Sequence, residues 1–218
     1  MPCDPPEPVK TQETQPKIVE SLVKNQLLTV GQPAFGGNIF KTLKVIGQYN
    51  NSFILCGSTV NDALYLLDQH SLEESIRFSY FVRHKRVVKQ TLTFRQNFTD
   101  RLPLDRKCVL DQQERVTFGE EWGFKIQREG GQYYLLQTGI IDNKLLTVDD
   151  LVQMLNEDTT VPEQIHKIWA NRACKASVKL GDQLTMAQMC QLLVKAAECG
   201  TCFNCPHGRP TIQQLEIE

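Results

Sequence analysis

The chain has 218 residues, of which 41% are hydrophobic and 22% are charged, and its formal net charge at pH 7 is −1. This is an ordinary globular composition, long enough for one large domain or two small ones. The near-neutral charge excludes recruitment of nucleic acid by the surface as a whole, so a DNA contact would need a local basic patch. No apolar run approaches the roughly 18 to 20 residues that cross a bilayer, and the N-terminus lacks an apolar signal core. We therefore expect an intracellular protein with no membrane partner.

The first 41 residues are predicted to be a linker or tail. Residues 1–16 are rich in proline and polar side chains and cannot bury enough apolar surface to fold, so a spacer is favoured over a peptide ligand. Residues 18–27 have apolar side chains at helical spacing and predict one short amphipathic helix. A glycine-rich loop is expected over 31–38.

Three strands and a helix are predicted next. Runs rich in Ile, Leu and Val cover 43–46, 52–56 and 63–67, and the first two are expected to form a hairpin. The helix begins at His70 and ends in a basic run that contains Arg83, Lys85 and Arg86. A solvated helix end that complements the helix dipole is the favoured interpretation of this run, and a DNA-backbone contact or nuclear signal is the alternative.

Residues 88–157 are predicted to form a smaller α+β lobe inserted into the first. A capping box formed by Thr147 and Asp150 opens its last helix. The expected strand, helix, two hairpin strands and final helix cover 90–98, 105–121, 124–127, 133–137 and 147–156.

Two further helices and a short strand complete the α+β fold. Pro162 occupies the first position of a helix that runs to about residue 180. A capping box of Thr185 and Gln188 opens the next helix. Its predicted buried stripe consists of Met186, Met189, Leu192 and Leu193. A loop over 200–210 and a strand near 212–215 follow.

One imidazole and two carboxylates converge where the third strand meets its helix. Asp68 stands at the strand end, and His70 and Glu74 are four residues apart on one helix face. Such a pair is more often found on an ordinary helix surface than in a metal site. Cys174 and the segment 205–207 offer further ligands, which favours a transition-metal site.

Eight cysteines in a chain without a secretion signal indicate thiols or metal ligands in preference to a disulfide framework. The C-terminal spacing of Cys199, Cys202, Cys205 and His207 allows a self-contained zinc knuckle. Cys199 also continues the apolar stripe of the preceding helix, so core packing is an alternative for it. Cys205 and His207 lie in a loop stiffened by proline and glycine and are the better ligands.

Taken together, three segments resemble the metal-binding motifs of the MutL-type DNA mismatch repair endonucleases. They are Asp-Gln-His-Ser-Leu-Glu-Glu at 68–74, Ala-Cys-Lys at 173–175 and Cys-Pro-His-Gly-Arg-Pro at 205–210, in that order and separation. Residues 47–55 also look like the strand that opens the family's C-terminal domain. The likeness extends over about 43–215 and is greatest to the eukaryotic paralogues of meiotic crossing-over and post-replicative repair.

The resemblance implies a dimerisation lobe at 42–87 and 158–218 with an inserted external lobe at 88–157. It implies a nuclear protein that pairs with a second MutL homologue, as a heterodimer or a homodimer, and acts on duplex DNA. Asp68 and Glu74 would be the catalytic carboxylates, and Arg209 would support a phosphate or the loop. The implied metal ligands are His70, Glu74, Cys174, Cys205, His207 and Asp68.

The implied chemistry is metal-assisted attack of water on a DNA phosphodiester in mismatch repair or meiotic recombination. Thiolates with imidazoles favour Zn²⁺, whereas a hydrolytic ion at Asp68 and Glu74 favours Mn²⁺ or Mg²⁺. The alternative is a non-catalytic MutL-type dimerisation module with a structural zinc site. A free zinc-knuckle binding protein is a weaker third hypothesis.

Two positions depart from the family's pattern. Ser79 stands where the first motif usually has a second glutamate, and Ser71 replaces the usual alanine. Loss of the carboxylate at 79 would weaken metal binding or packing. The chain has no nucleotide-binding signature, so we expect the family's ATP-driven switch to lie outside these residues. Residues 90–92 stand where relatives carry a sliding-clamp motif, and a plain strand is favoured there over a clamp contact.

Overall fold

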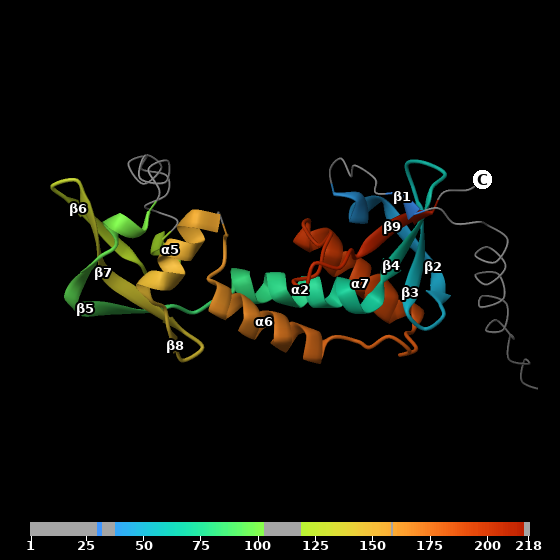
Figure 1. Ribbon diagram of the computed structural model, residues 1–218. Coiled ribbons are helices and arrows are strands. Elements are labelled where there is room, and N and C mark those ends of the chain that lie inside the picture. The colour runs from blue at the N-terminus through green and yellow to red at the C-terminus, as the bar shows by residue number, and fades with distance from the viewer. Residues whose placement is uncertain (1–29, 32–37, 103–118, 158, 216–218) are drawn as a thin grey trace, which may run out of the picture. The chain divides into compact units, whose positions relative to one another are not determined.

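The computed structural model describes residues 30–31, 38–102, 119–157 and 159–215 (Figure 1). The expected N-terminal helix at 18–27 and most of the expected helix at 105–121 lie outside these residues. The chain divides into two compact units, one from Met1–Ser79 with Ala173–Glu218 (unit 1) and one from Tyr80–Arg172 (unit 2). These boundaries lie inside two helices, whereas the sequence placed them after residues 87 and 157.

Unit 1 is built on a sheet of five strands in the order β1-β9-β4-β3-β2. All of the pairs between these described strands are antiparallel. The strands are β1 (Val30–Gly31), β2 (Leu43–Tyr49), β3 (Phe53–Ser58), β4 (Leu64–Asp68) and β9 (Ile212–Leu215).

The predicted hairpin between the first two long strands is confirmed. Asn50 and Asn51 both adopt left-handed backbone conformations, with φ of 51° and 48°. Asparagine tolerates this region, and two such residues in succession form the turn whose twist matches that of paired strands. The amide of Ser52 donates to the Tyr49 carbonyl at 3.1 Å and closes the turn.

Both faces of this sheet carry apolar side chains, because alternate residues of each strand point to opposite sides. The first face includes Ile54, Cys56 and Leu67 and belongs to the main core of unit 1. Burial there raises the pKa of the Cys56 thiol to about 12, with a further contribution from nearby Cys190. On the second face, Leu55 and Leu215 are buried. Partly buried apolar side chains surround them: Ile46, Tyr49, Leu64 and Leu66.

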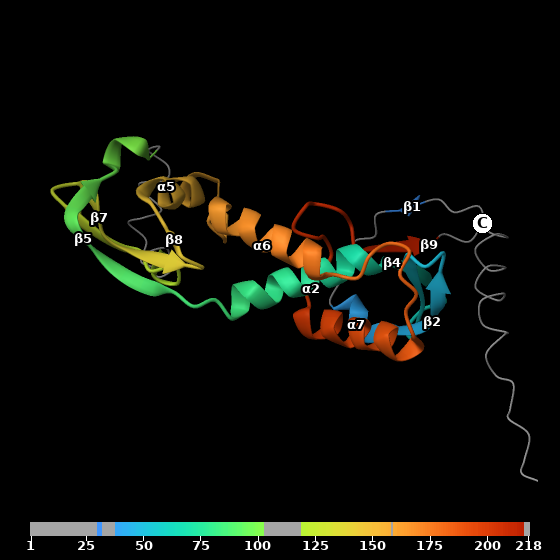
Figure 2. The ribbon, with the colours of Figure 1, turned by 90° about the horizontal axis from the view of Figure 1, so that it is seen from below.

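The main core is closed by α7 (Met186–Cys199), which lies beside β2 in Figure 2. The predicted capping box is confirmed, since the Thr185 side chain accepts from the Gln188 amide and the Gln188 side chain accepts from the Thr185 amide. Three of the four predicted stripe residues are buried. The prediction was wrong for Met186, which stands at the first position of the helix, at the edge of the stripe, and is 36% exposed.

Helix α2 (Gln69–Arg83) follows β4 directly. The Asp68 carboxylate accepts a hydrogen bond from the Ser71 amide at 2.8 Å, which satisfies one of the free donors at the start of the helix. All seven residues from 69 to 75 are buried. The first two turns of α2 are therefore enclosed on every side, so any polar group there needs a partner within the protein.

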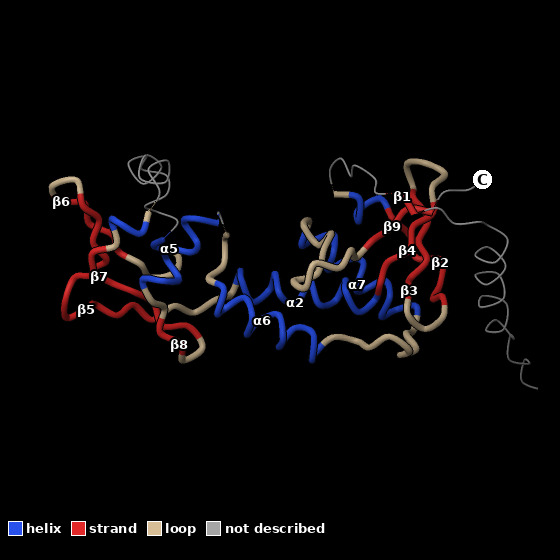
Figure 3. The backbone as a smooth tube through the Cα atoms, in the orientation of Figure 1, coloured by secondary structure: helices blue, strands red, loops and turns tan. Residues whose placement is uncertain are grey.

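Helix α6 (Glu163–Ala176) ends four residues before the predicted position of about 180. The Ser177 hydroxyl donates to the Ala173 carbonyl at 2.8 Å, and the Lys179 ammonium donates to the Cys174 carbonyl at 2.6 Å. These side chains satisfy carbonyl groups of the last turn and end the helix. The chain then turns back towards the β2–β3 turn, where the Gly181 amide donates to the Asn51 carbonyl at 2.8 Å (Figure 3).

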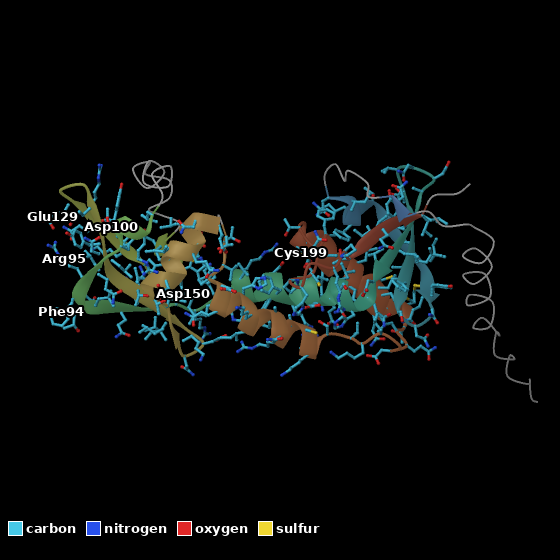
Figure 4. All side chains as sticks on the ribbon, in the orientation of Figure 1. Phe94, Arg95, Asp100, Glu129, Asp150 and Cys199 are labelled. Carbon is cyan, nitrogen blue, oxygen red and sulfur yellow. A yellow bond between two sulfur atoms is a disulfide. The ribbon has the colours of Figure 1, made fainter. Side chains whose placement is uncertain are left out.

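Unit 2 has a second antiparallel sheet with the order β5-β7-β6, and β8 also pairs with β7. Its strands are β5 (Val88–Asn97), β6 (Lys125–Glu129), β7 (Gln132–Ile141) and β8 (Lys144–Leu145). Arg95 and Glu129 form an ion pair at one end of the sheet, where Figure 4 shows their side chains directed towards each other.

One α-helix and one 3₁₀ turn complete the description of unit 2. The predicted capping box opens α5 (Val148–Glu157), since the Asp150 carboxylate accepts from the Thr147 amide at 2.7 Å. The short 3₁₀ helix η2 (Thr99–Arg101) follows β5, and η1 (Ile39–Thr42) precedes β2 in unit 1.

The α+β prediction is confirmed. In the described part of the chain, no helix is long and apolar enough to span a membrane.

Substitution of Gly139 by alanine should destabilise unit 2. A Cβ atom at this position would overlap the backbone oxygen of Trp122 and come within 2.8 Å of the Val87 side chain. We expect the free energy of unfolding to fall by about 3 kcal/mol, measured by urea denaturation. Gly57→Ala is the matched control, because the nearest atom to its Cβ would be Ile46 Cδ1 at 3.5 Å. Equal stability of the two variants would contradict this packing.

Candidate metal centre

Five of the predicted ligands lie together in unit 1 as two overlapping groups of three. The first group contains His70, Glu74 and Cys174, and the second contains Glu74, Cys205 and His207. Within each group, one potential ligand atom from every residue lies within 4.8 Å of the others. Ligands bound at about 2.0 to 2.3 Å from one ion have comparable separations, so each group can hold one cation. Glu74 belongs to both groups and can bridge them.

The first group is assembled by two helices. His70 and Glu74 are one turn apart in the buried start of α2, and His70 Nε2 lies 3.7 Å from the Glu74 carboxylate. Cys174 stands in the last turn of α6, with its sulfur 3.6 Å from His70 Nε2. The strand-to-helix transition thus presents two ligands, and the end of α6 supplies the third.

The direction of the His70 ring follows from its second nitrogen. His70 Nδ1 lies 2.8 Å from the carbonyl oxygen of Val178. Because a carbonyl oxygen can only accept, Nδ1 carries a proton, and in the neutral ring Nε2 then presents its lone pair. The lone pair faces Cys174 and Glu74, which is the tautomer that a metal ligand requires.

The second group depends on a tight loop after α7. The Cys205 amide donates to the Arg209 carbonyl, and the Gly208 amide donates to the Cys205 carbonyl, both at 2.8 Å. Gly208 has a φ of 84°, a conformation that glycine adopts without steric penalty. The loop brings the His207 ring into contact with the Glu74 carboxylate.

Burial is the main cause that raises the pKa of the Cys205 thiol, and the nearby Glu74 carboxylate adds to it. Backbone amides of Arg209 and His207 oppose the shift by donating towards the sulfur. Arg209 therefore supports the loop through its backbone, and its side chain is exposed. A cation bound at Cys205 would replace the thiol proton, because the thiolate is the ligand form.

The donor set fits a divalent cation. Glu74 is 1% exposed, and its ionic partners among the described residues are the His70 and His207 rings. A buried carboxylate is unfavourable unless a positive charge compensates it. Two imidazoles, two thiols and one shared carboxylate are the ligand types that Zn²⁺ prefers.

Asp68 belongs to neither group of the described residues. Its carboxylate is half-buried and accepts from the Ser71 amide, which places it beside the start of α2. Ser79 is also outside both groups. Five residues along a helix correspond to a rotation of roughly 140° from Glu74, so a carboxylate at 79 would lie on a different face. Its replacement by serine removes no ligand from either group.

The predicted basic run lies in unit 2. Arg83 and Arg86 are exposed, whereas the side chain of Lys85 is 15% exposed. The Lys85 ammonium pairs with Glu121 at 3.1 Å and lies 4.8 Å from the centre of the Trp122 ring. Lys85 is therefore engaged inside unit 2, whereas the side chains of Arg83 and Arg86 are exposed.

The zinc-knuckle hypothesis is wrong, because Cys199 and Cys202 are joined by a disulfide. The expectation that the cysteines are thiols or metal ligands therefore fails for these two. Their Cα atoms are 6.3 Å apart, because Cys199 ends α7 and the chain turns at Gly200. Cys199 is also buried in the main core, as its alternative interpretation predicted.

Two buried polar residues of α2 have structural contacts that the sequence did not predict. The side-chain amide of Gln69 donates to the Lys179 carbonyl at 2.7 Å and accepts from the side chain of Gln48 at 2.6 Å. Glu73 accepts from the Val178 amide at 2.7 Å and pairs with Arg77. The i,i+4 spacing of Glu73 and Arg77 was the available sequence signal, whereas the partners of Gln69 are distant in the chain.

Comparisons with known proteins find similar sequences in DNA mismatch repair. The family model described as the MutL C terminal dimerisation domain matches residues 46–184. Mismatch repair endonuclease PMS2 from Homo sapiens is 28% identical over 190 residues, which cover 81% of this chain and 21% of that protein. DNA mismatch repair protein MutL from Symbiobacterium thermophilum is 30% identical over 201 residues, which cover 86% of this chain and 31% of that protein.

DNA mismatch repair protein pms1 from Schizosaccharomyces pombe is 26% identical over 187 residues, or 81% of this chain and 23% of that protein. The chain thus spans between about a fifth and a third of the length of these relatives.

Two buried serines of α2 should respond in opposite ways to alanine substitution. The Ser71 hydroxyl is buried with no hydrogen-bond partner among the described residues, whereas the Ser75 hydroxyl donates to the Asn204 carbonyl at 2.9 Å. We expect Ser71→Ala to raise the free energy of unfolding by about 1 kcal/mol and Ser75→Ala to lower it by about 1 kcal/mol, measured by urea denaturation. Destabilisation by both substitutions would refute the unpaired state of the Ser71 hydroxyl.

Proposed function

Because the chain belongs to the MutL C-terminal dimerisation domain family, we propose that unit 1 is a metal-dependent endonuclease centre that nicks duplex DNA. The observation that carries the proposal is the buried Glu74 carboxylate, shared by two groups of imidazole and thiol ligands. The relatives named mismatch repair endonuclease support the reaction type. The pathway would be mismatch repair or meiotic recombination.

In this proposal the five grouped residues would hold the cations. His70 and Cys174 would hold one ion, Cys205 and His207 would hold a second, and Glu74 would be available to both. Zn²⁺ suits the thiolates and imidazoles, while Mn²⁺ or Mg²⁺ would serve hydrolysis near Asp68 and Glu74. A bound divalent ion supplies an activated water and offsets charge on the phosphate in the transition state.

Asp68 has the role of proton acceptor. The Ser71 amide holds one of its oxygens at 2.8 Å, so the carboxylate is fixed beside the ligand helix. The second oxygen can then accept the proton of the attacking water. The whole chain has a net charge of −1, so DNA must be held by a local surface, for which Arg83 and Arg86 are candidates, or by the partner.

A non-catalytic dimerisation module with a structural zinc site is the second candidate. The observation that favours it is the position of Asp68 outside both ligand groups. Closed sets of thiolates and imidazoles are also typical of structural zinc. The two candidates differ in whether Asp68 is needed for a reaction.

The partner would be a second MutL homologue, in a heterodimer or a homodimer, in the nucleus. We assign the second face of the unit 1 sheet to this contact. Leu64 and Leu66 remain partly exposed there around the buried Leu55 and Leu215. An apolar sheet face of this kind is stabilised by covering it with a partner. A sliding clamp is a weaker proposal, because Gln90 and Thr91 lie within β5 and pair with β7, as the strand prediction required.

Asp68→Asn should abolish nicking without loss of folding. The amide keeps an oxygen that can accept from the Ser71 amide, but it cannot take up a proton. We expect nicking of supercoiled plasmid with Mn²⁺ at low salt to fall at least about 100-fold. The wild-type chain and the variant are compared with and without a second MutL homologue. Equal nicking by the wild-type chain and the variant would favour the structural module. So would a wild-type chain that binds zinc but nicks no DNA, either alone or with a second MutL homologue.

Leu66→Asp should weaken dimer formation, because it introduces a charge on the apolar second face of the sheet. We expect sedimentation velocity to show at least a tenfold rise in the dimer dissociation constant, alone or with a second MutL homologue. Val194→Asp is the matched control, since Val194 is 57% exposed on α7. Association that is insensitive to Leu66→Asp, or equally sensitive to both variants, would exclude this face as the interface.

A further inference from the structure

One residue of the turn after α6 is held from both sides by α2. The Val178 amide donates to Glu73 Oε2 at 2.7 Å. The Val178 carbonyl accepts from His70 Nδ1 at 2.8 Å. Two side chains three residues apart on one helix therefore hydrogen-bond to the backbone N–H and to the backbone carbonyl of Val178. This residue lies more than 100 positions away in the sequence.

Glu73 is itself rigidly placed. It is 8% exposed, and its second oxygen accepts from Arg77 Nε at 3.1 Å and Nη2 at 2.6 Å. Both oxygens of the carboxylate thus have partners. A charge-assisted hydrogen bond to a backbone amide is stronger than a neutral one, so Glu73 is a firm anchor for Val178.

The same turn is not fixed by Glu73 alone. The side-chain amide of Gln69 donates to the Lys179 carbonyl at 2.7 Å, and the backbone amide of Lys179 donates to the Asp182 carboxylate at 2.7 Å. These contacts keep the turn near α2 when Glu73 is altered. The Lys179 amide lies in the same planar peptide unit as the Val178 carbonyl, so Asp182 helps to orient that carbonyl. Neither contact binds the Val178 amide, so Glu73 alone among these residues fixes Val178 from its amide side.

We propose that Glu73 is a positioning residue for the metal centre, acting through the backbone of Val178 to direct the His70 ring. The inference rests on the proposed metal site and adds a residue that is not a ligand. By fixing the position of Val178 through its amide, Glu73 holds the carbonyl of that residue within reach of His70 Nδ1, which keeps the proton on Nδ1 and directs Nε2 at Cys174 and Glu74. The second group, with Cys205 and His207, has no such dependence.

The two groups allow this role to be separated from general stability. Each contains one thiol, so Cys205→Ser leaves Cys174 as the only cysteine ligand, and Cys174→Ser leaves only Cys205. Titration with Co²⁺ then reports each group through its own thiolate-to-cobalt charge-transfer absorption. Glu73→Ala is introduced into both backgrounds of the 218-residue chain, with Glu73→Gln as the conservative variant that retains an acceptor oxygen for the Val178 amide.

We expect Glu73→Ala to weaken Co²⁺ binding at least about tenfold in the Cys205→Ser background and by less than about twofold in the Cys174→Ser background. Glu73→Gln should restore most of the affinity. Equal weakening in both backgrounds would assign Glu73 a purely structural role, and unchanged affinity in the Cys205→Ser background would refute the proposal.

A measurement on the metal-free chain separates this inference from the proposed function. Long-range ¹H–¹⁵N correlation spectra identify which nitrogen of neutral His70 carries the proton. The wild-type ring should be protonated at Nδ1, and Glu73→Ala should shift the population towards Nε2. An unchanged tautomer in Glu73→Ala would overturn the positioning role even if the chain binds metal and nicks DNA. If the chain does not bind cobalt but the tautomer of His70 shifts in Glu73→Ala, the metal centre would be overturned and the link between Glu73 and His70 would stand.

Discussion

The buried carboxylate of Glu74 is the constraint on which unit 1 depends. It is 1% exposed and lies between two imidazoles, one from its own helix and one from the loop after α7. Isolated in a core, such a charge would be strongly unfavourable, so its surroundings must supply compensating charge. Because Glu74 belongs to two ligand groups, the proposed pair of cations would supply that compensation.

The fold around Glu74 serves to bring distant segments to one point. Strand β4 leads directly into α2, the end of α6 supplies Cys174, and the loop after α7 supplies Cys205 and His207. The sheet underneath has two apolar faces, one covered by α7 within the chain and the other only partly buried. In the proposed function, a single sheet would support the metal centre on one side and contact a second subunit on the other.

The features that the sequence predicted are those whose signals are local. The β2–β3 hairpin follows from Asn50 and Asn51, and the start of α7 follows from Thr185 and Gln188, all within four residues of the structure they determine. The five grouped residues could be picked out because each motif is short. The end of α6 was misplaced, because it depends on Lys179 and on contacts between the following turn and α2.

Glu73 and Glu74 illustrate the limit of such reasoning. They are adjacent and chemically identical, yet one anchors the backbone of Val178 and the other contacts His207. Their partners are 105 and 133 residues away in the chain, so the roles are decided by tertiary contacts that no local pattern records. The same applies to Cys199 and Cys202, whose spacing suits a zinc site but whose partners are each other.

The most direct test of the proposed metal centre is anomalous diffraction at the zinc edge from crystals of the chain grown with Zn²⁺. We expect zinc density on both sides of the Glu74 carboxylate, within about 2.3 Å of its oxygens, with His70 and Cys174 on one ion and Cys205 and His207 on the other. Zinc density absent from Glu74, with the carboxylate bound only by the two imidazoles, would contradict it.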